Sequence, residues 1–168
     1  ARFVCEEHYG LFRAPPVQLV CPPNLMFMYM PSHLNHMIFE LMKNSLRAVV
    51  ERYGVEREDH YPPIKVIVVE GKEDITIKIS DEGGGIPRSE VPLVWTYTYT
   101  TARPDDLDPD FQTSDFLAPM AGFGYGLPLA RLYARYFGGD LKLISMEGYG
   151  TDVYLHLNRL SSSSEPLP

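Results

Sequence analysis

The chain has 168 residues, 45% hydrophobic and 12% aromatic, which is long enough to bury the core of one folded domain. Its 15 Lys and Arg residues against 22 Asp and Glu give a formal net charge of −7, so no basic field is available for a nucleic-acid backbone. The longest apolar run, 25–30, is far shorter than the roughly 18 residues of a membrane span. Cys5 and Cys21 form no CxxC pair, and we expect neither a structural zinc site nor a disulfide framework.

The first segment, 1–31, is interrupted by prolines and predicts a strap over the domain, with a short helix over 2–9 and a strand over 17–20. A long helix is predicted next. Ser32 is a suitable N-cap, and Gly54 ends the helical pattern. The apolar positions that recur at helical spacing are Leu34, Met37, Ile38, Leu41, Leu46, Val49 and Val50.

The middle of the chain predicts a β-hairpin followed by loops. The runs 64–69 and 74–80 are rich in β-branched residues and are joined by a turn-like Glu-Gly-Lys-Glu segment. Residues 81–87 follow as a loop from the strand end. Residues 96–121 are rich in Asp and Pro without a usable period, which predicts a long loop of the kind that acts as a lid.

The last part predicts a helix over 127–137 and a second hairpin over 141–145 and 151–157. The apolar stripe expected on that helix consists of Leu129, Leu132, Tyr133 and Tyr136. Together these elements predict an α+β fold: a two-layer α/β sandwich, with one mixed sheet and helices on one face. We expect one domain over 1–160 and a flexible tail over 161–168.

A polar stripe accompanies the apolar one on the long helix, at spacings of three and four: His36, Glu40, Lys43, Asn44 and Arg47. A solvated helix face is the simpler interpretation. Asn44, however, is a poor helix former one turn after Glu40. A carboxylate and an amide oxygen so placed suit a general base and a Mg²⁺ ligand.

Two glycine-rich segments add a phosphate-binding signal. Residues 81–85 leave a strand end, where consecutive glycines permit close backbone approach. Residues 122–127 open a helix, whose free N–H groups favour phosphate, although an ordinary loop-to-helix joint would have the same pattern. The glycine spacing differs from the dinucleotide fingerprint. A P-loop and the signature of ordinary protein kinases are both missing.

Four motifs in order carry a family resemblance: Glu40-x-x-x-Asn44, Asp81-x-Gly83-x-Gly85, Gly122-x-Gly124-x-Gly126 and Gly148-x-Gly150-Thr151. This set resembles the Bergerat-type ATP-binding domain shared by gyrase, Hsp90, histidine kinases and MutL, the GHKL superfamily. The wording of the motifs is similar to the mitochondrial pyruvate dehydrogenase kinases. The ending, 165–168, is similar to plant-type members.

The resemblance implies a role for each matching residue. Glu40 would be the general base towards a serine hydroxyl, with His36 tuning it, and Asn44 would hold Mg²⁺ against the phosphates. Asp81 would accept from the adenine amino group, supported by Thr151. The implied ATP-binding residues are Glu40, Leu41, Met42, Lys43, Asn44, Ser45, Leu46, Arg47, Asp81, Gly83, Gly85, Thr100, Thr101, Gly122, Phe123, Gly124, Tyr125, Gly126, Leu127 and Thr151.

The implied activity is that of a protein serine kinase of the mitochondrial matrix, using ATP and Mg²⁺ to phosphorylate and inactivate the E1α subunit of the pyruvate dehydrogenase complex. Family members dimerise and dock the E2 lipoyl domain through an N-terminal helical bundle, which this sequence is expected to lack. Three alternatives stay open: a branched-chain ketoacid dehydrogenase kinase, an ATPase conformational switch such as Hsp90 or MutL, and a histidine-kinase catalytic domain.

Overall fold

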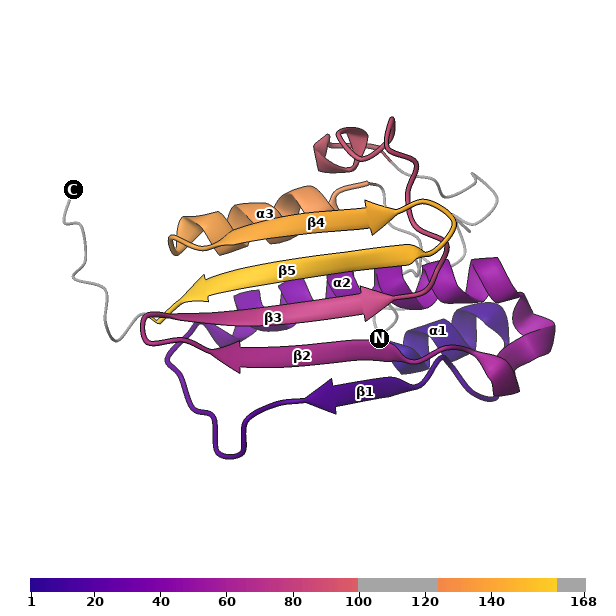
Figure 1. The fold of residues 1–168 in the computed structure, drawn as a ribbon, viewed down its shortest axis with the longest axis horizontal. Coiled ribbons are helices and arrows are strands. Elements are labelled where there is room, and N and C mark those ends of the chain that lie inside the picture. Colours follow the sequence, from indigo (N-terminus) through magenta and orange to yellow (C-terminus); the bar gives the residue numbers. More distant parts are fainter. Residues whose placement is uncertain (100–123, 160–168) are drawn as a thin grey trace, which may run out of the picture.

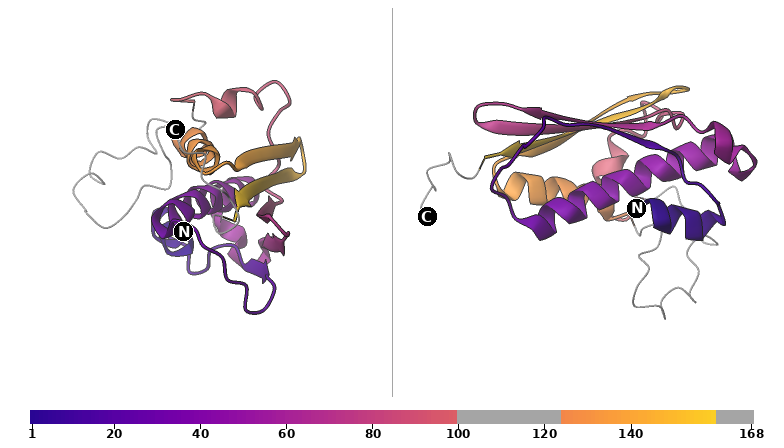
Figure 2. Two further views of the ribbon diagram at one scale, coloured as in Figure 1. Left: turned by 90° about the vertical axis from the view of Figure 1, so that its left-hand side faces the viewer. Right: turned by 90° about the horizontal axis from the view of Figure 1, so that it is seen from below.

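The computed structural model describes residues 1–99 and 124–159, which form a five-stranded sheet with helices on one face (Figure 1 and Figure 2). The strand order is β1-β2-β3-β5-β4, with β1 parallel to β2 and every other pair antiparallel. The strands are β1 (Val17–Val20), β2 (Ile64–Glu70), β3 (Asp74–Asp81), β4 (Asp140–Met146) and β5 (Gly150–Asn158). The predicted mixed sheet and the α+β class are confirmed.

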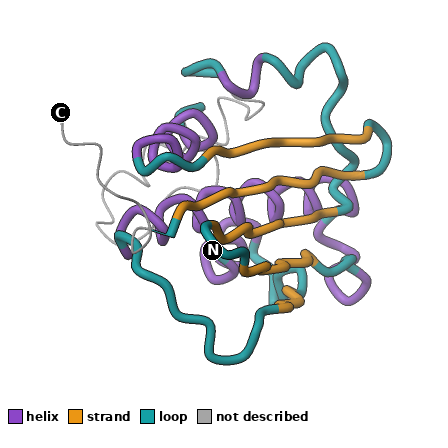
Figure 3. Tube along the Cα trace, turned by 60° about the vertical axis from the view of Figure 1, so that its left-hand side comes forward, coloured by secondary structure: helices purple, strands orange, loops and turns teal. Residues whose placement is uncertain are grey.

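The helices are α1 (Arg2–Tyr9), α2 (Pro31–Tyr53) and α3 (Gly126–Tyr136), with short 3₁₀ turns η1 (Val55–His60) and η2 (Leu93–Trp95). Helix α2 lies across the sheet and contacts α1 on one side and α3 on the other (Figure 2). Figure 3 shows the long helix α2 running behind the strands. Within the described ranges, no helix is both long and apolar enough to cross a bilayer.

The core lies between the sheet and α2. Alternate residues of the two central strands point towards the helices and are buried: Ile75, Ile77, Ile79, Val153, Leu155 and Leu157. Met37, Leu41 and Leu46 of α2 meet them from the other side. The opposite sheet face is polar: Lys78 pairs with Asp152 at 2.7 Å. One face buried and one polar is the period-2 alternation expected of such strands.

Residues 21–30, the last part of the predicted strap over 1–31, also alternate between partly buried and exposed side chains. Leu25, Phe27 and Tyr29 pack against the core, and Met26 and Met28 are exposed. This extended segment connects the edge strand β1 to the start of α2. Figure 3 shows it as the wide loop at the bottom of the view.

The predicted N-cap of α2 was wrong. The helix begins at Pro31 with Met30 as its N-cap, and no side chain caps it. Proline suits the first helical position because its fixed φ matches a helix and its missing N–H has no partner there. The predicted end at Gly54 is confirmed, since the Gly54 N–H donates to the carbonyl of Val50 at 2.8 Å.

The predicted apolar stripe of α3 was wrong for two of its four residues, whereas Tyr133 packs against the core. Leu132 and Tyr136 are 54% and 76% exposed, and the buried residues are Pro128, Ala130 and Ala134. Small side chains let the α3 backbone approach α2 and β4 closely. Size therefore outweighed hydrophobicity in choosing the buried face of this helix.

We expect Ala134→Leu to lower the free energy of unfolding by about 1–3 kcal/mol, because extra methylenes in a filled interior force neighbours off their rotamers. The matched variant Leu132→Ala removes a larger but exposed side chain and should change it by less than about 0.5 kcal/mol. Urea unfolding of both measures this. If Leu132→Ala lowered the free energy of unfolding more than Ala134→Leu, the apolar stripe predicted from the sequence would be the buried face after all.

Candidate functional site

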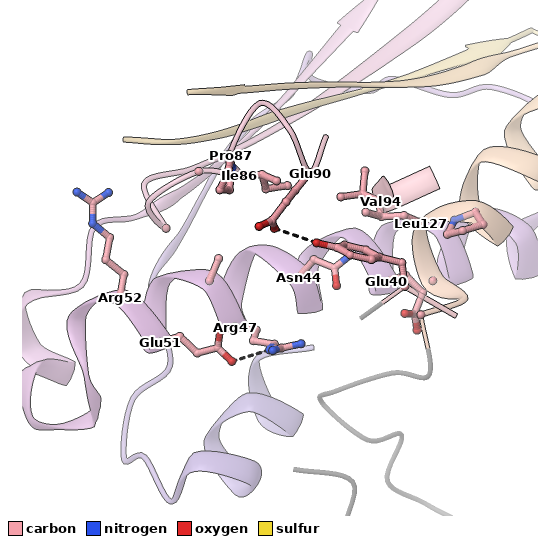
Figure 4. Close-up of a pocket in the computed structure, with 17 residues that line it drawn as sticks. Glu40, Asn44, Arg47, Glu51, Arg52, Ile86, Pro87, Glu90, Val94 and Leu127 are labelled. Atoms are coloured by element: carbon pink, nitrogen blue, oxygen red, sulfur yellow. Dashed lines mark hydrogen bonds and ion pairs between the residues drawn. The ribbon is translucent and has the colours of Figure 1, made fainter. Parts of the chain in front are cut away.

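A pocket of about 490 Å³ lies between α2, the turn after β3 and the start of α3 (Figure 4). This volume is in the range of small-molecule sites, about 300–1,000 Å³. Figure 4 shows Glu40, Asn44 and Arg47 projecting from α2, with Ile86 and Glu90 on the loop facing them. The predicted site residues that line it are Glu40, Asn44, Arg47, Gly83, Gly85, Gly124, Gly126 and Leu127.

Glu40 is held between two elements. Its Oε1 lies 2.8 Å from the Lys43 ammonium, one turn further along α2. Its Oε2 faces Gly126, the first residue of α3, where a side-chain carbon would lie only 2.6 Å away. The absence of a side chain at Gly126 thus gives this carboxylate its place in the pocket wall.

Asp81 ends β3 and is buried, with 7% of its surface exposed. Its Oδ1 accepts from the Gly83 N–H at 2.9 Å, and Ser45 and the Thr151 N–H also donate to it. Burial raises the pKa of the Asp81 carboxyl, and these three hydrogen bonds oppose that rise. A carboxylate held at a strand end beside a pocket-lining glycine is suited to accept a hydrogen bond from a bound base.

Thr151 lies directly opposite Asp81 in the β3/β5 register, as the resemblance implies. Its hydroxyl is 2.9 Å from that of Ser145 on β4, and Ser145 also accepts from the Ile86 N–H at 2.7 Å. These contacts connect the ends of three strands with the turn that lines the pocket. Ser145 was missed because an alternating strand residue carries no signal of its own.

The turn after β3 is fastened to the turn between β4 and β5. The Gly84 N–H donates to the carbonyl of Tyr149 at 3.0 Å, and the Gly148 N–H donates to the carbonyl of Gly84 at 2.7 Å. Gly85 has φ +70°, and any side chain there would clash with the Met146 carbonyl. The glycines therefore allow two backbones to meet at the edge of the pocket.

Arg52 strengthens this junction from the last turn of α2. Its guanidinium donates to the carbonyls of Glu82 and Gly148, each at 2.9 Å, and to that of Tyr149. No pattern in the sequence indicates this role, since an arginine near a helix C-terminus is explained by a favourable charge at the helix dipole. Its function depends on contacts far away in the chain.

We expect Arg52→Met to loosen both turns and to weaken binding of the ATP that the resemblance implies by about 10-fold, because hydrogen bonds from a charged group contribute roughly 1.5–3 kcal/mol and these are exposed to solvent. The exposed Arg57, on the neighbouring 3₁₀ turn, provides the control variant Arg57→Met. Calorimetric titration measures both. Equal affinities for the two variants would show that Arg52 does not hold the pocket wall.

The start of α3 supplies donors to the same pocket. Tyr125 is the N-cap and makes no side-chain capping bond, and Gly126, Leu127 and Pro128 line the pocket. The first N–H groups of a helix have no partner within it, and the dipole there attracts anions. The predicted placement of the second glycine-rich segment at a helix N-terminus agrees with this geometry for residues 124–127.

Other predicted site residues lie elsewhere. Leu41, Met42 and Leu46 belong to the core, and Lys43 is buried rather than solvated. His36 packs edge-on against Tyr133 at 5.3 Å, and its Nε2 is buried without a hydrogen-bond partner among the described residues. Tyr125 is 43% exposed. Thr100, Thr101, Gly122 and Phe123 lie outside the described residues.

The pocket also has charged residues that the sequence did not single out. Glu90 accepts from the Tyr99 hydroxyl at 2.8 Å, and Glu51 pairs with Arg47 at 2.6 Å. In the part of the chain that the structure describes, three carboxylates and two guanidiniums thus line the pocket: Glu40, Glu51, Glu90, Arg47 and Arg52. The lining thus has one more negative than positive formal charge, which a cation bound with an anionic ligand would balance.

The profile of the histidine kinase-, DNA gyrase B- and HSP90-like ATPases matches residues 30–161. The chain belongs to this family of ATP-binding domains, and the pocket between α2 and α3 lies within the matched region.

Among individual proteins, the chain is similar to mitochondrial [pyruvate dehydrogenase (acetyl-transferring)] kinases. It is 64% identical to the Schizosaccharomyces pombe protein over 99% of this chain and 40% of that protein. It is 57% identical to the Arabidopsis thaliana protein over 100% of this chain and 45% of that one, and 49% identical to human isozyme 3, over 100% and 41%. The chain thus spans about two fifths of the length of these relatives.

Proposed function

We propose that this chain is the catalytic ATP-binding domain of a mitochondrial protein serine kinase that phosphorylates and inactivates the E1α subunit of the pyruvate dehydrogenase complex. The observation that carries the proposal is its 64% identity, over 99% of its length, to the Schizosaccharomyces pombe kinase. The domain would extend over 1–160, with 161–168 as a tail. We also propose that this protein belongs to a group of these kinases that includes the plant-type members. Its similarity to both a fungal and a plant kinase supports this assignment.

We assign tasks in phosphoryl transfer to three groups in or beside the pocket. Glu40 takes the proton from the attacking serine hydroxyl, and Asp81 accepts from the adenine amino group. The N–H groups at the start of α3 donate to the phosphates. Phosphoryl transfer depends mainly on such positioning and on preorganised donors, because its transition state is loose.

Magnesium fits the donor set of this pocket. When bound, Mg²⁺ neutralises charge on the phosphates and orients them. Within 1–99 and 124–159, no cluster of three or more His, Cys, Asp or Glu could hold a metal by itself. Asn44 is exposed in the pocket, and one protein oxygen completed by phosphates and waters is how Mg²⁺ commonly binds nucleotides.

The proposal includes location and partners. The names of the relatives place those proteins in mitochondria, and we extend this to the matrix for the present chain. We also propose that the full-length protein dimerises and docks the E2 lipoyl domain through an N-terminal domain outside this chain.

The test is transfer of labelled γ-phosphate from ATP to serine peptides by the full-length protein. Phosphorylation of a peptide from pyruvate dehydrogenase E1α supports the proposal. Preference for the branched-chain enzyme's peptide would instead indicate the branched-chain kinase. Release of free phosphate without transfer to either peptide would indicate an ATPase switch and refute the proposal.

A further inference from the structure

Lys43 is a buried charged residue that the proposed chemistry has not yet used. Only 4% of its surface is exposed, although it lies three residues after Glu40 on a helix whose polar positions would otherwise face solvent. Removing an ammonium from water costs several kcal/mol, and its ion pair rarely repays this cost in stability. An apolar side chain of similar length would pack there with less penalty, so the charge needs another explanation.

Two contacts of Lys43 lie on its own helix, and one of them is with Glu40. Its Nζ lies 2.8 Å from Glu40 Oε1 and 5.3 Å from the centre of the Phe39 ring. Lys43 is not among the residues that line the pocket, whereas Glu40 is. The Glu40 carboxylate therefore faces the pocket, and the Lys43 ammonium contacts it from outside the pocket lining.

The second carboxylate oxygen lies against the start of α3. Oε2 faces Gly126 so closely that a methyl group on Gly126 would approach it to 2.6 Å. One oxygen is therefore held by a buried cation on α2, and the other lies against the first residue of α3. With Oε1 at the Lys43 ammonium, Oε2 lies beside the helix N-terminus that would hold the phosphates.

We propose that Lys43 is a positioning residue: its buried ammonium fixes Oε1 of Glu40 so that Oε2 faces the attacking hydroxyl. This inference rests on the proposed function, in which Glu40 is the general base. Lys43 itself contacts neither ATP nor the peptide. A base displaced by about 1 Å loses up to about 10²-fold in rate, which sets the scale of the expected effect.

The test is Lys43→Met in the full-length protein, which keeps the length of the side chain and removes its charge. We expect kcat for phosphate transfer to fall by about 10- to 100-fold, with KM for ATP within about 2-fold of the wild type. Lys65→Met, at an exposed position of β2, is the control and should change neither constant. Lys43→Arg, which retains a cation, should recover part of the rate.

A double-mutant cycle separates positioning from a structural role. In a Glu40→Gln background the carboxylate is already lost, so adding Lys43→Met should slow transfer by less than about 2-fold. A further loss of about 10-fold or more would overturn the proposal, and so would a parallel loss of ATP affinity. If Lys43→Met does not fold, as judged by thermal melting, Lys43→Gln replaces it in the same cycle.

The failure of this inference is distinguishable from failure of the proposed function. If the wild-type protein transfers no phosphate to peptide but hydrolyses ATP, the kinase proposal fails, and the same cycle is measured on phosphate release, where water takes the place of serine. If the wild type transfers phosphate and Glu40→Gln slows it, but Lys43→Met does not, only the role of Lys43 is refuted.

Discussion

Glu40→Gln is expected to bind Mg-ATP like the wild-type protein and to transfer phosphate about 10²-fold or more slowly. Glutamine preserves the shape of the side chain, and its amide cannot take a proton from serine at neutral pH. The substitution removes the charge that faces the buried Lys43 ammonium at 2.8 Å, although the amide oxygen can still accept a hydrogen bond from it, so thermal melting is measured alongside to show that the variant folds. Single-turnover transfer to an E1α peptide, together with a calorimetric Mg-ATP titration, measures both quantities.

Asn44→Ala is the matched variant one turn away. Its amide has no basic function, so nucleotide binding should weaken first, and raised Mg²⁺ should partly restore it. The two roles would be exchanged if Glu40→Gln lost ATP affinity and Asn44→Ala retained it. If neither variant changed binding or transfer, the polar stripe of α2 would be no more than a solvated helix face.

Asp81→Ala is expected to weaken ATP binding by about 10²-fold and to remove the preference for ATP over GTP. A pocket built to accept a hydrogen bond from an amino group rejects a base that presents a carbonyl there, and a bond to a charged acceptor contributes roughly 1.5–3 kcal/mol. Asp152→Ala, on the open face of the sheet, is the control and should bind ATP normally. Equal affinity of the wild type for ATP and GTP would show that Asp81 does not recognise the base.

The raised pKa of Asp81 adds a pH dependence with a definite sign. Because burial raises its pKa in the folded state, the charged carboxylate opposes folding at neutral pH, and this cost disappears as the pH falls through the folded-state value. Affinity for ATP should fall over the same interval, since a protonated carboxyl accepts less well. Titration calorimetry and urea unfolding at successive pH values measure the two trends. Asp140 and Asp152, whose pKa values are lowered, also titrate in acid, so the contribution of Asp81 is the difference between the wild-type and Asp81→Ala curves.

Periodic segments made the architecture predictable. The apolar positions of α2 and the β-branched runs around Ile75–Ile79 identify elements long enough to bury a face, so their types were correct and their ends differed by a residue or two. The stripe of α3 failed at two positions because packing distance favoured Ala130 and Ala134 over larger residues. Such a choice depends on the neighbouring helix, which a local pattern cannot describe.

The site was predictable where one motif supplied several residues together. Glu40 and Asn44 share a helix face, and Asp81 and Gly83 share a turn, so their proximity follows from local geometry. Arg52 and Glu90 act through contacts that no motif describes and were missed. The burial of Lys43 was hidden for a related reason, since opposite charges three residues apart on a helix usually indicate a solvated surface.

The pairing of β3 with β5 has a consequence for folding kinetics. Ser80 and Asp152 meet across these two strands although they are 72 positions apart, and Asp81 meets Thr151 in the same register. Closing so long a loop is entropically slow and is repaid only after many contacts form. The strand ends that carry Asp81 and Thr151 therefore meet late during refolding, and recovery of nucleotide binding should lag behind recovery of helical circular dichroism.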